Sequence, residues 1–245
     1  MGCSGIELAP DKIWAKPLQS SLNDRLSIRH AIESHGLELI GFHALLYTRQ
    51  DLKLFDSQNS FTRTSNYLGS LASLCAEMGG KNLIFGSPSN RSLCGRPYEE
   101  CYNQAILGFR ELAKVCKSHG VNFCIEPLPS SQNQFITSAS EGEKLVKHVN
   151  HPNFCLHLDA SALRQESSPA HSIIENTITP KHFHVNDPGL TVPGSSTNDL
   201  PLIIEALRKK NYNGYLSIEV VSDNCNSQQR LKSSIDYVQR QLERN

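Results

Sequence analysis

The strand–helix–strand unit at residues 122–159, NFCIEPLPSSQNQFITSASEGEKLVKHVNHPNFCLHLD, decides the fold. A short apolar run at Asn122–Leu128 precedes a helical pattern at Glu141–His148, and a second apolar run follows at Phe154–Asp159. Apolar runs of this length on both sides of a helix are typical of parallel strands joined by a crossover helix. The unit therefore predicts an α/β fold.

The same alternation extends along the whole chain. Strand-like runs occupy seven segments: Gly5–Ala9, Leu37–Tyr47, Asn82–Gly86, Asn122–Leu128, Phe154–Asp159, His182–Asn186 and Gly214–Val220. Helical patterns occupy six: Asn23–Ser34, Thr62–Met78, Glu99–Ser118, Glu141–His148, Pro201–Lys210 and Ser227–Glu243. Glycine follows several of the helices, as at Gly79 and Gly120, which is typical of a helix end before a strand. An open doubly wound sheet usually has a Gly-rich phosphate turn after its first strand, and GIELAPDKIW has none, so we predict a (β/α) barrel.

A complete (β/α)8 TIM barrel has eight strands, and the sequence contains seven strand-like runs. We therefore expect a TIM barrel that lacks the first β-strand and helix. Its length of 245 residues suits one barrel, so we expect a single domain over residues 1–245. Unpaired strand edges at Gly5–Ala9 and Gly214–Val220 would favour a homodimer.

Composition excludes several classes of protein. Lys and Arg number 24, as do Asp and Glu, so there is no basic surface charge for nucleic acid or for an anionic membrane. No apolar run approaches the ~20 residues of a membrane span, and the first residues lack a secretion signal. The eight cysteines include no CxxC pair, which favours reduced thiols. We expect a cytoplasmic protein whose partner is a small molecule.

Four successive strand-like runs end in a side chain that can bind a metal. These residues are Glu126, Asp159, His184 and Glu219. Strand alternation places each of them on the same face as the residue two positions earlier: Cys124, His157, His182 and Ser217. Active sites of barrel enzymes lie at the carboxyl ends of the strands, so the four side chains are expected to converge there.

Three carboxylates in one place repel one another unless a cation lies between them. An oxygen-rich set with one imidazole suits one divalent ion, with Mn²⁺ favoured and Mg²⁺, Co²⁺ or Zn²⁺ as alternatives. Taken singly, each glutamate or aspartate is more often a loop residue, and His184 alone would fit a hydrogen-bonded interior imidazole. The convergence of all four favours the metal site.

The stretches SGIELAP, GSPSNR, LHLDAS, HFHVND and YLSIEV resemble the xylose-isomerase-like TIM-barrel superfamily, in its sugar phosphate isomerase/epimerase branch. The resemblance implies that Glu126, Asp159, His184 and Glu219 bind one divalent ion. The family's His-x-x-acid pattern selects His184 over its neighbour His182, since Asp187 lies three positions further on.

The resemblance also implies an isomerase or epimerase that acts on a sugar or a sugar phosphate. The cation would polarise the substrate carbonyl and stabilise an enediolate formed by proton loss. Glu126 and Glu219 would serve opposite faces of the reacting carbon as general base and general acid.

Two positions depart from the pattern of these epimerases, Ala162 where a histidine is typical and Gln132 where an acidic residue is frequent. Three alternatives therefore stay open. One is a degenerate barrel with a binding role only. Another is a nuclease of the endonuclease IV type, which would need more histidines than this chain offers at strand ends. The third is a dehydratase of an inosose-like cyclitol.

Three further residues are candidates for substrate binding. His43 ends the apolar part of GFHALLY and would point into the pocket, or it is a buried hydrogen-bonded imidazole. Arg91 in GSPSNR could hold a phosphate or carboxylate, or it braces its loop. Glu7 closes GIELA and could accept a substrate hydroxyl, with a structural salt bridge as the alternative.

Overall fold

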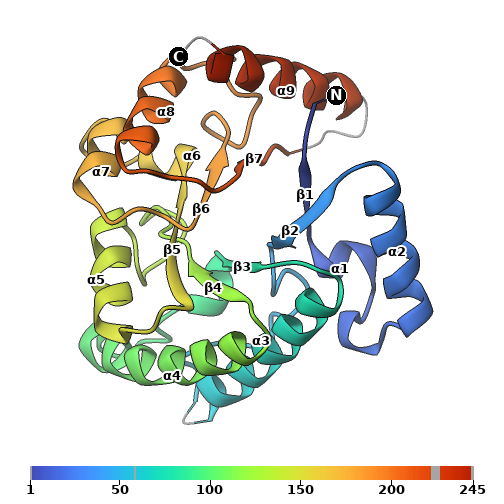
Figure 1. Cartoon of the computed structure of the whole chain (residues 1–245). Coiled ribbons are helices and arrows are strands. Elements are labelled where there is room, and N and C mark those ends of the chain that lie inside the picture. Colours follow the sequence, from blue (N-terminus) through green and yellow to red (C-terminus); the bar gives the residue numbers. More distant parts are fainter. Residues whose placement is uncertain (1, 58, 222–226, 244–245) are drawn as a thin grey trace.

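The computed structural model contains seven parallel strands that form a nearly closed barrel (Figure 1). The structure describes residues 2–57, 59–221 and 227–243. In sheet order the strands are β1 (Gly5–Leu8), β2 (Glu38–Phe42), β3 (Asn82–Phe85), β4 (Asn122–Ile125), β5 (Phe154–Asp159), β6 (His182–Val185) and β7 (Leu216–Ile218). The predicted α/β barrel is confirmed.

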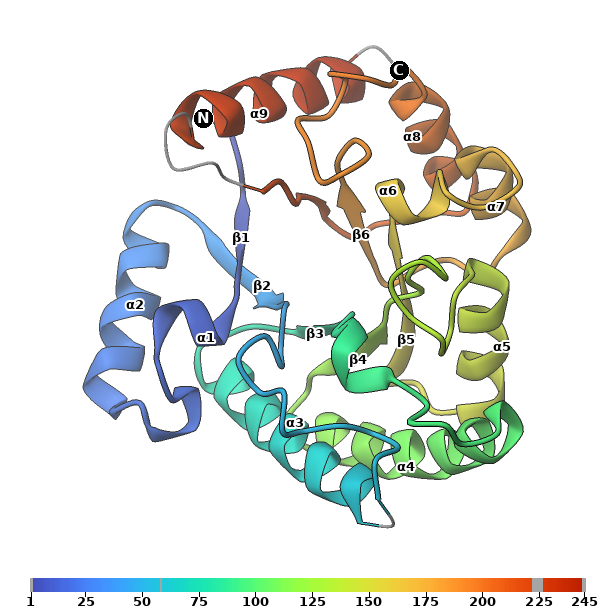
Figure 2. The same ribbon diagram turned by 180° about the vertical axis from the view of Figure 1, so that it is seen from behind.

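Helices lie outside the ring of strands, as Figures 1 and 2 show from opposite sides. The longer helices are α2 (Leu22–Ser34), α3 (Ser60–Glu77), α4 (Tyr98–Ser118), α5 (Ala139–Val149), α8 (Leu200–Lys209) and α9 (Ser227–Glu243). All six match the sequence prediction to within two residues at either end. The sequence did not predict the short elements α1 (Pro10–Ile13), α6 (Ala160–Leu163), α7 (Ala170–Asn176), η1 (Pro17–Gln19) and η2 (Pro88–Arg91). They have seven residues or fewer, which is too short for a 3.6-residue periodicity to stand out.

Strand β2 is shorter than the sequence predicted. The apolar run Leu37–Tyr47 suggested one long strand, but the strand ends at Phe42. Two residues later the backbone of Ala44 has a φ of +49°, in the left-handed region that strands do not use. His43 therefore follows the strand instead of lying within it.

Consecutive strands are hydrogen-bonded neighbours from β1 to β7, but within the described residues no register joins β7 back to β1. The two strands that the sequence analysis expected to have unpaired edges are the two ends of the sheet order. Any link between them must come from side chains.

A cluster of four phenylalanines fixes strands β3, β4 and β5 beneath helix α4. The rings of Phe85, Phe109, Phe123 and Phe154 are fully or almost fully buried, with neighbouring centroids 5.2 to 6.1 Å apart. Aromatic contacts in this range add stability beyond the burial of their apolar area. The cluster thus packs against strands β4 and β5, whose carboxyl ends carry Glu126 and Asp159.

No helix among the described residues is long and apolar enough to cross a membrane. Seven of the cysteines are free thiols, whereas Cys225 lies outside the described residues.

Gly41 of β2 provides a test of the barrel packing. A Cβ atom at this position would overlap the backbone carbonyl of Asn82 on β3, and neither backbone can move without breaking the strand register. We expect Gly41→Ala to lower the free energy of unfolding in urea by about 2–3 kcal/mol. In the matched control Gly69→Ala, the new methyl group would meet the side chain of Val115 at 3.2 Å and the helix would gain propensity, so stability should change by less than about 1 kcal/mol. Equal losses in the two variants would contradict the close approach of β2 and β3.

Candidate active site

A cavity of about 750 Å³ opens at the carboxyl ends of the strands. All four strand-end residues contribute to its wall, namely Glu126, Asp159, His184 and Glu219. Glu126 directly follows β4, Asp159 is the last residue of β5, His184 lies within β6, and Glu219 directly follows β7. The regular offset of parallel strands therefore brings together residues that are up to 93 positions apart in sequence.

Glu126, Asp159 and His184 each present a ligand atom, and these three atoms lie within 4.8 Å of one another. Glu219 approaches from the other side, with its Oε2 3.1 Å from Nδ1 of His184. Glu126, Asp159 and His184 are buried, and the side chain of Glu219 is 28% exposed. The structure thus brings together the four residues that the sequence analysis named, and the first three could hold a metal ion.

His43 and Glu7 contact this group from two directions. His43 lines the cavity and its Nδ1 lies 3.2 Å from Oε1 of Glu219. Glu7 does not line the cavity. Its Oε2 accepts a hydrogen bond of 2.9 Å from Nε2 of His184, behind the cavity wall. Glu7 therefore forms the ion pair that the sequence analysis held as the alternative to binding a substrate hydroxyl.

Arg91 lies apart from the cavity wall. Its side chain is fully buried, and the cavity lining includes the preceding Asn90 but not Arg91. None of its three guanidinium nitrogens has a hydrogen-bond partner within the described residues, and the group lies 5.8 Å from the ring centroid of Phe85. Burial lowers the pKa of Arg91 to about 10, against the opposing charge of Glu126. The structure does not bring this residue to the cavity where a phosphate would bind.

The acidic groups of the cavity have pKa values that are shifted in opposite directions. Burial, with the neighbouring charges of Glu219 and Asp159, raises the pKa of Glu126 to about 8. Burial also favours the neutral form of Glu219, but the charge and hydrogen bond of His184 outweigh it and hold this pKa well below its usual range. Burial opposes the charged form of His184 as well, yet the carboxylates of Glu219 and Glu7 raise its pKa well above 6.5. Glu219 and Glu7 thus favour the charged form of His184, whereas the charges of Glu219 and Asp159 oppose the charged form of Glu126.

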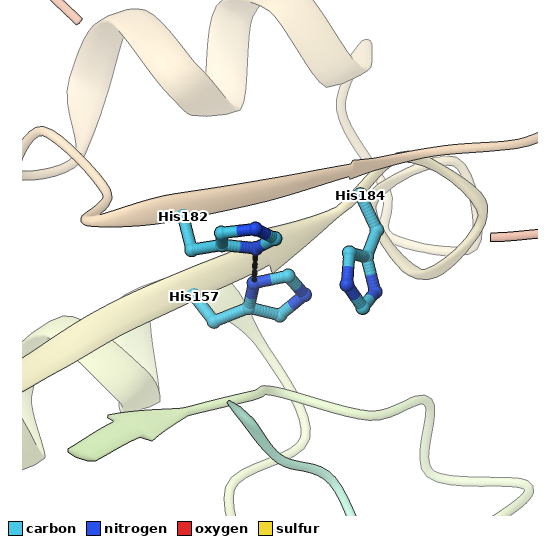
Figure 3. A group of neighbouring side chains, drawn as sticks. All are labelled: His157, His182 and His184. Atoms are coloured by element: carbon cyan, nitrogen blue, oxygen red, sulfur yellow. Dashed lines mark hydrogen bonds between the residues drawn. The ribbon is translucent and has the colours of Figure 1, made fainter. Parts of the chain in front are cut away.

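Two buried histidines below the cavity were not given a role from the sequence. Figure 3 shows His157 and His182 next to His184, with their rings facing one another. Burial lowers the pKa of both, which favours their neutral forms. The signal was present in the alternation of β5 and β6, because each histidine lies two residues before a cavity residue on the same face.

Asn186 is a third residue that sequence reasoning missed. Its Nδ2 donates a hydrogen bond of 2.6 Å to Oδ2 of Asp159, while the backbone amide of Ala162 donates to Oδ1. The carboxylate of Asp159 is thereby fixed in orientation. Asp187, the acid of the His-x-x-acid pattern, instead accepts hydrogen bonds from Ser196 and Thr197 within its own loop.

The two positions that depart from the epimerase pattern, Ala162 and Gln132, both line the cavity. A histidine or acid at either position would have faced the same space. Their uncharged side chains therefore change the part of the wall that a substrate would contact.

The model of the xylose isomerase-like TIM barrel family matches residues 1–241. Among curated proteins, the D-psicose 3-epimerase of Ruminiclostridium cellulolyticum is 33% identical over 119 residues, which are 48% of this chain and 41% of that protein. The 3-dehydro-D-guloside 4-epimerase of Escherichia coli is 28% identical over 161 residues, 59% of this chain and 58% of that protein. The matches thus cover less than two thirds of the length of these curated relatives.

Solved structures show the same fold over nearly the whole chain. A crystal structure of D-psicose 3-epimerase in the presence of D-fructose has a TM-score of 0.80 at 19% identity, covering 99% of this chain and 88% of that chain. A D-psicose 3-epimerase with D-tagatose from Clostridium cellulolyticum H10 has a TM-score of 0.83 at 19% identity, covering 98% and 90%. The resemblance to the xylose-isomerase-like superfamily is confirmed.

The raised pKa of Glu126 predicts how stability depends on pH in the metal-free protein. Between the ordinary glutamate pKa of 4.5 and about 8, the unfolded chain has lost this proton and the folded chain still holds it, so the contribution of Glu126 to stability falls as pH rises. Glu126→Gln removes this dependence. We expect the stability of the variant relative to the wild type to increase from pH 4.5 to 8, measured by urea unfolding in the presence of a chelator. A difference that stays constant or shrinks over this window would show that Glu126 titrates normally.

Proposed function

The chain belongs to the xylose isomerase-like TIM barrel family, and from that premise we propose that it is a divalent-metal-dependent sugar epimerase. The reaction would move a proton at the carbon next to a ketose carbonyl, through an enediolate. Two kinds of observation support this. First, curated relatives are epimerases of D-psicose and of a 3-dehydro-D-guloside. Second, the potential metal ligands and the carboxylates for proton transfer lie together in the cavity at one end of the barrel.

The chemistry of the side chains fits a divalent ion. Carboxylates of Glu126 and Asp159 and an imidazole of His184 offer hard oxygen donors with one nitrogen, a set suited to Mn²⁺, Mg²⁺, Co²⁺ or Zn²⁺. Glu219 is near enough to His184 to be the fourth ligand. A cation would also offset the burial and the neighbouring negative charges that raise the pKa of Glu126. When bound, it would polarise the substrate carbonyl and stabilise the negative charge that develops on proton loss.

Glu126 and Glu219 are the proposed pair for proton transfer. Their pKa values are shifted in opposite directions within one cavity, which is the arrangement expected of a general acid and a general base. Glu219 would take a proton on one face of the substrate carbon while Glu126 returns one on the other face, and the roles reverse for the opposite direction. His43, bonded to Glu219, would hold that carboxylate in place at the cavity wall.

The cavity wall supports an unphosphorylated substrate. No Lys or Arg among the described residues lines it, and its charged groups are three carboxylates and the imidazole of His184. The remaining polar lining consists of amides and hydroxyls such as Gln50, Gln132, Gln165 and Ser161, which can donate to and accept from sugar hydroxyls. A phosphate dianion would lie next to carboxylates with no basic side chain of the described wall to pair with, which is costly. The same wall offers no support for the endonuclease IV-like alternative.

Solvent exchange tests the epimerase proposal. With Mn²⁺ present, free ketoses incubated in D₂O should gain deuterium at the carbon next to the carbonyl, followed by mass spectrometry and NMR. Glu126→Gln and Glu219→Gln should each lower the rate by about 100-fold or more, because each removes one proton-transfer group. The control Glu175→Gln changes an exposed glutamate paired with Lys209 on the outside of the barrel and should leave the rate unchanged. Metal binding without exchange on any ketose would instead support the degenerate barrel with a binding role.

The choice between free and phosphorylated sugars is tested separately. We expect kcat/KM for a ketose to exceed that for its phosphate by at least about 10-fold, since like charges meet at the cavity wall. Gln132→Arg adds a cation to this wall and should raise the ratio of phosphate to free-sugar activity. A wild-type preference for the phosphorylated sugar would contradict the neutral-substrate proposal while leaving the epimerase proposal intact.

A further inference from the structure

We infer that His157, His182 and Glu7 form a buried chain that fixes the tautomer of His184 and leaves its Nδ1 free to bind the cation. The inference rests on the proposed function in one respect, the role of His184 as a metal ligand. It assigns positioning roles to three residues, none of which lines the cavity.

The chain begins with two histidines on adjacent strands. His157 of β5 and His182 of β6 are partners in the strand register, and their rings are stacked with centroids 5.2 Å apart (Figure 3). Their Nδ1 atoms form a hydrogen bond of 3.2 Å. Such a bond needs one proton, so one ring must donate and the other must accept.

Glu7 determines which ring donates. Its Oε1 lies 3.2 Å from Nε2 of His182, an ion-pair contact that does not have hydrogen-bond geometry, and neither atom has a hydrogen-bond partner within the described residues. Each oxygen of Glu7 faces an imidazole nitrogen, Nε2 of His182 or Nε2 of His184, and an unprotonated Nε2 would place its lone pair against a carboxylate oxygen. The proton of a neutral His182 therefore belongs on Nε2, toward Glu7. Its Nδ1 is then the acceptor, and His157 carries its proton on Nδ1.

The second oxygen of Glu7 acts on His184. Oε2 accepts the 2.9 Å hydrogen bond from Nε2 of His184, which keeps a proton on that nitrogen. The other ring nitrogen, Nδ1, points to Glu219, a residue of the cavity wall. A cation can replace the proton at Nδ1 without disturbing Nε2. Metal-binding histidines commonly donate their second ring N–H to such a carboxylate, which fixes the orientation of the ring and raises its basicity.

A second cation among the three histidines is the rival explanation, because their ligand atoms also lie within 4.8 Å of one another. The proton arrangement argues against it. In that arrangement Nδ1 of His182 accepts a hydrogen bond from His157, and Nε2 of both His182 and His184 carries a proton. The free lone pair is Nε2 of His157, 3.9 Å from Oε1 of Glu126. A single free lone pair is not enough to bind an ion among the three histidines. If the wild-type chain bound two zinc ions, the inference would be overturned.

Histidine NMR on the full-length protein tests the chain directly. Long-range ¹H–¹⁵N spectra of ¹⁵N-histidine-labelled protein, assigned with single His→Gln variants, report which ring nitrogen carries the proton. We expect Nδ1–H for His157 and Nε2–H for His182 without metal, and Nε2–H with a ligated Nδ1 for His184 after loading with Zn²⁺. Nε2–H on His157, or Nδ1–H on His182, would overturn the chain even if a cation binds. If wild-type protein binds no cation, the proposed function fails, and the metal-free spectra still test the chain.

Metal affinity provides the second measurement. Glu7→Gln and His182→Gln should each weaken Zn²⁺ binding by about 10–100-fold at constant pH, by competition with a chelating dye. The matched control His148→Gln replaces an exposed histidine that contacts Tyr102 on the outside of the barrel and should not change it. Residues with a purely structural role would lower stability and leave the affinity of the folded fraction unchanged. That result would overturn the positioning role, and if the variants do not fold, the wild-type spectra remain decisive.

Discussion

The rest of the site depends on the two hydrogen bonds that the imidazole of His184 makes with carboxylates. One ring nitrogen bonds to Glu7 of β1 and the other to Glu219 after β7, while the residue itself belongs to β6. Strands β1 and β7 have no hydrogen-bonded register with each other among the described residues. Side chains therefore connect the two ends of the sheet near the cavity. The bridge runs from the carboxylate of Glu7 through the imidazole of His184 to the carboxylate of Glu219. The same bridge brings two acidic groups into a buried space, which the backbone alone would not favour.

The electrostatic balance of the cavity follows from that bridge. His184 compensates Glu7 and Glu219, so the pKa values of these two acids are low, while Glu126 lies outside the bridge and its pKa is high. A divalent cation near Glu126 and Asp159 would supply the charge that the protein itself does not. With the proposed cation bound, the barrel would still present two carboxyl groups in different electrostatic surroundings.

Much of this architecture could be predicted from the sequence, for identifiable reasons. Helix and strand patterns of ordinary length are visible in a single sequence, and parallel strands bring their carboxyl ends together, so Glu126, Asp159, His184 and Glu219 could be grouped without coordinates. The end of β2 could not be predicted, because the left-handed turn at Ala44 involves a residue that usually continues such a run. Nor could the burial of Arg91 away from the cavity, since η2 is a single short turn with no periodicity. His157 and His182 were visible on the correct faces, but the proton order among them depends on Glu7, a contact 175 residues away in sequence from His182.

The lack of basic side chains on the described cavity wall has a consequence for how ligands arrive. Electrostatic attraction speeds association when protein and ligand carry opposite charges, and this gain falls as ionic strength rises. For the neutral sugar that we propose as substrate, a cavity without Lys or Arg on its described wall would have no such attraction to lose. Its encounter rate would be set by diffusion and by the width of the opening, and so it would be the same in dilute buffer and in concentrated salt.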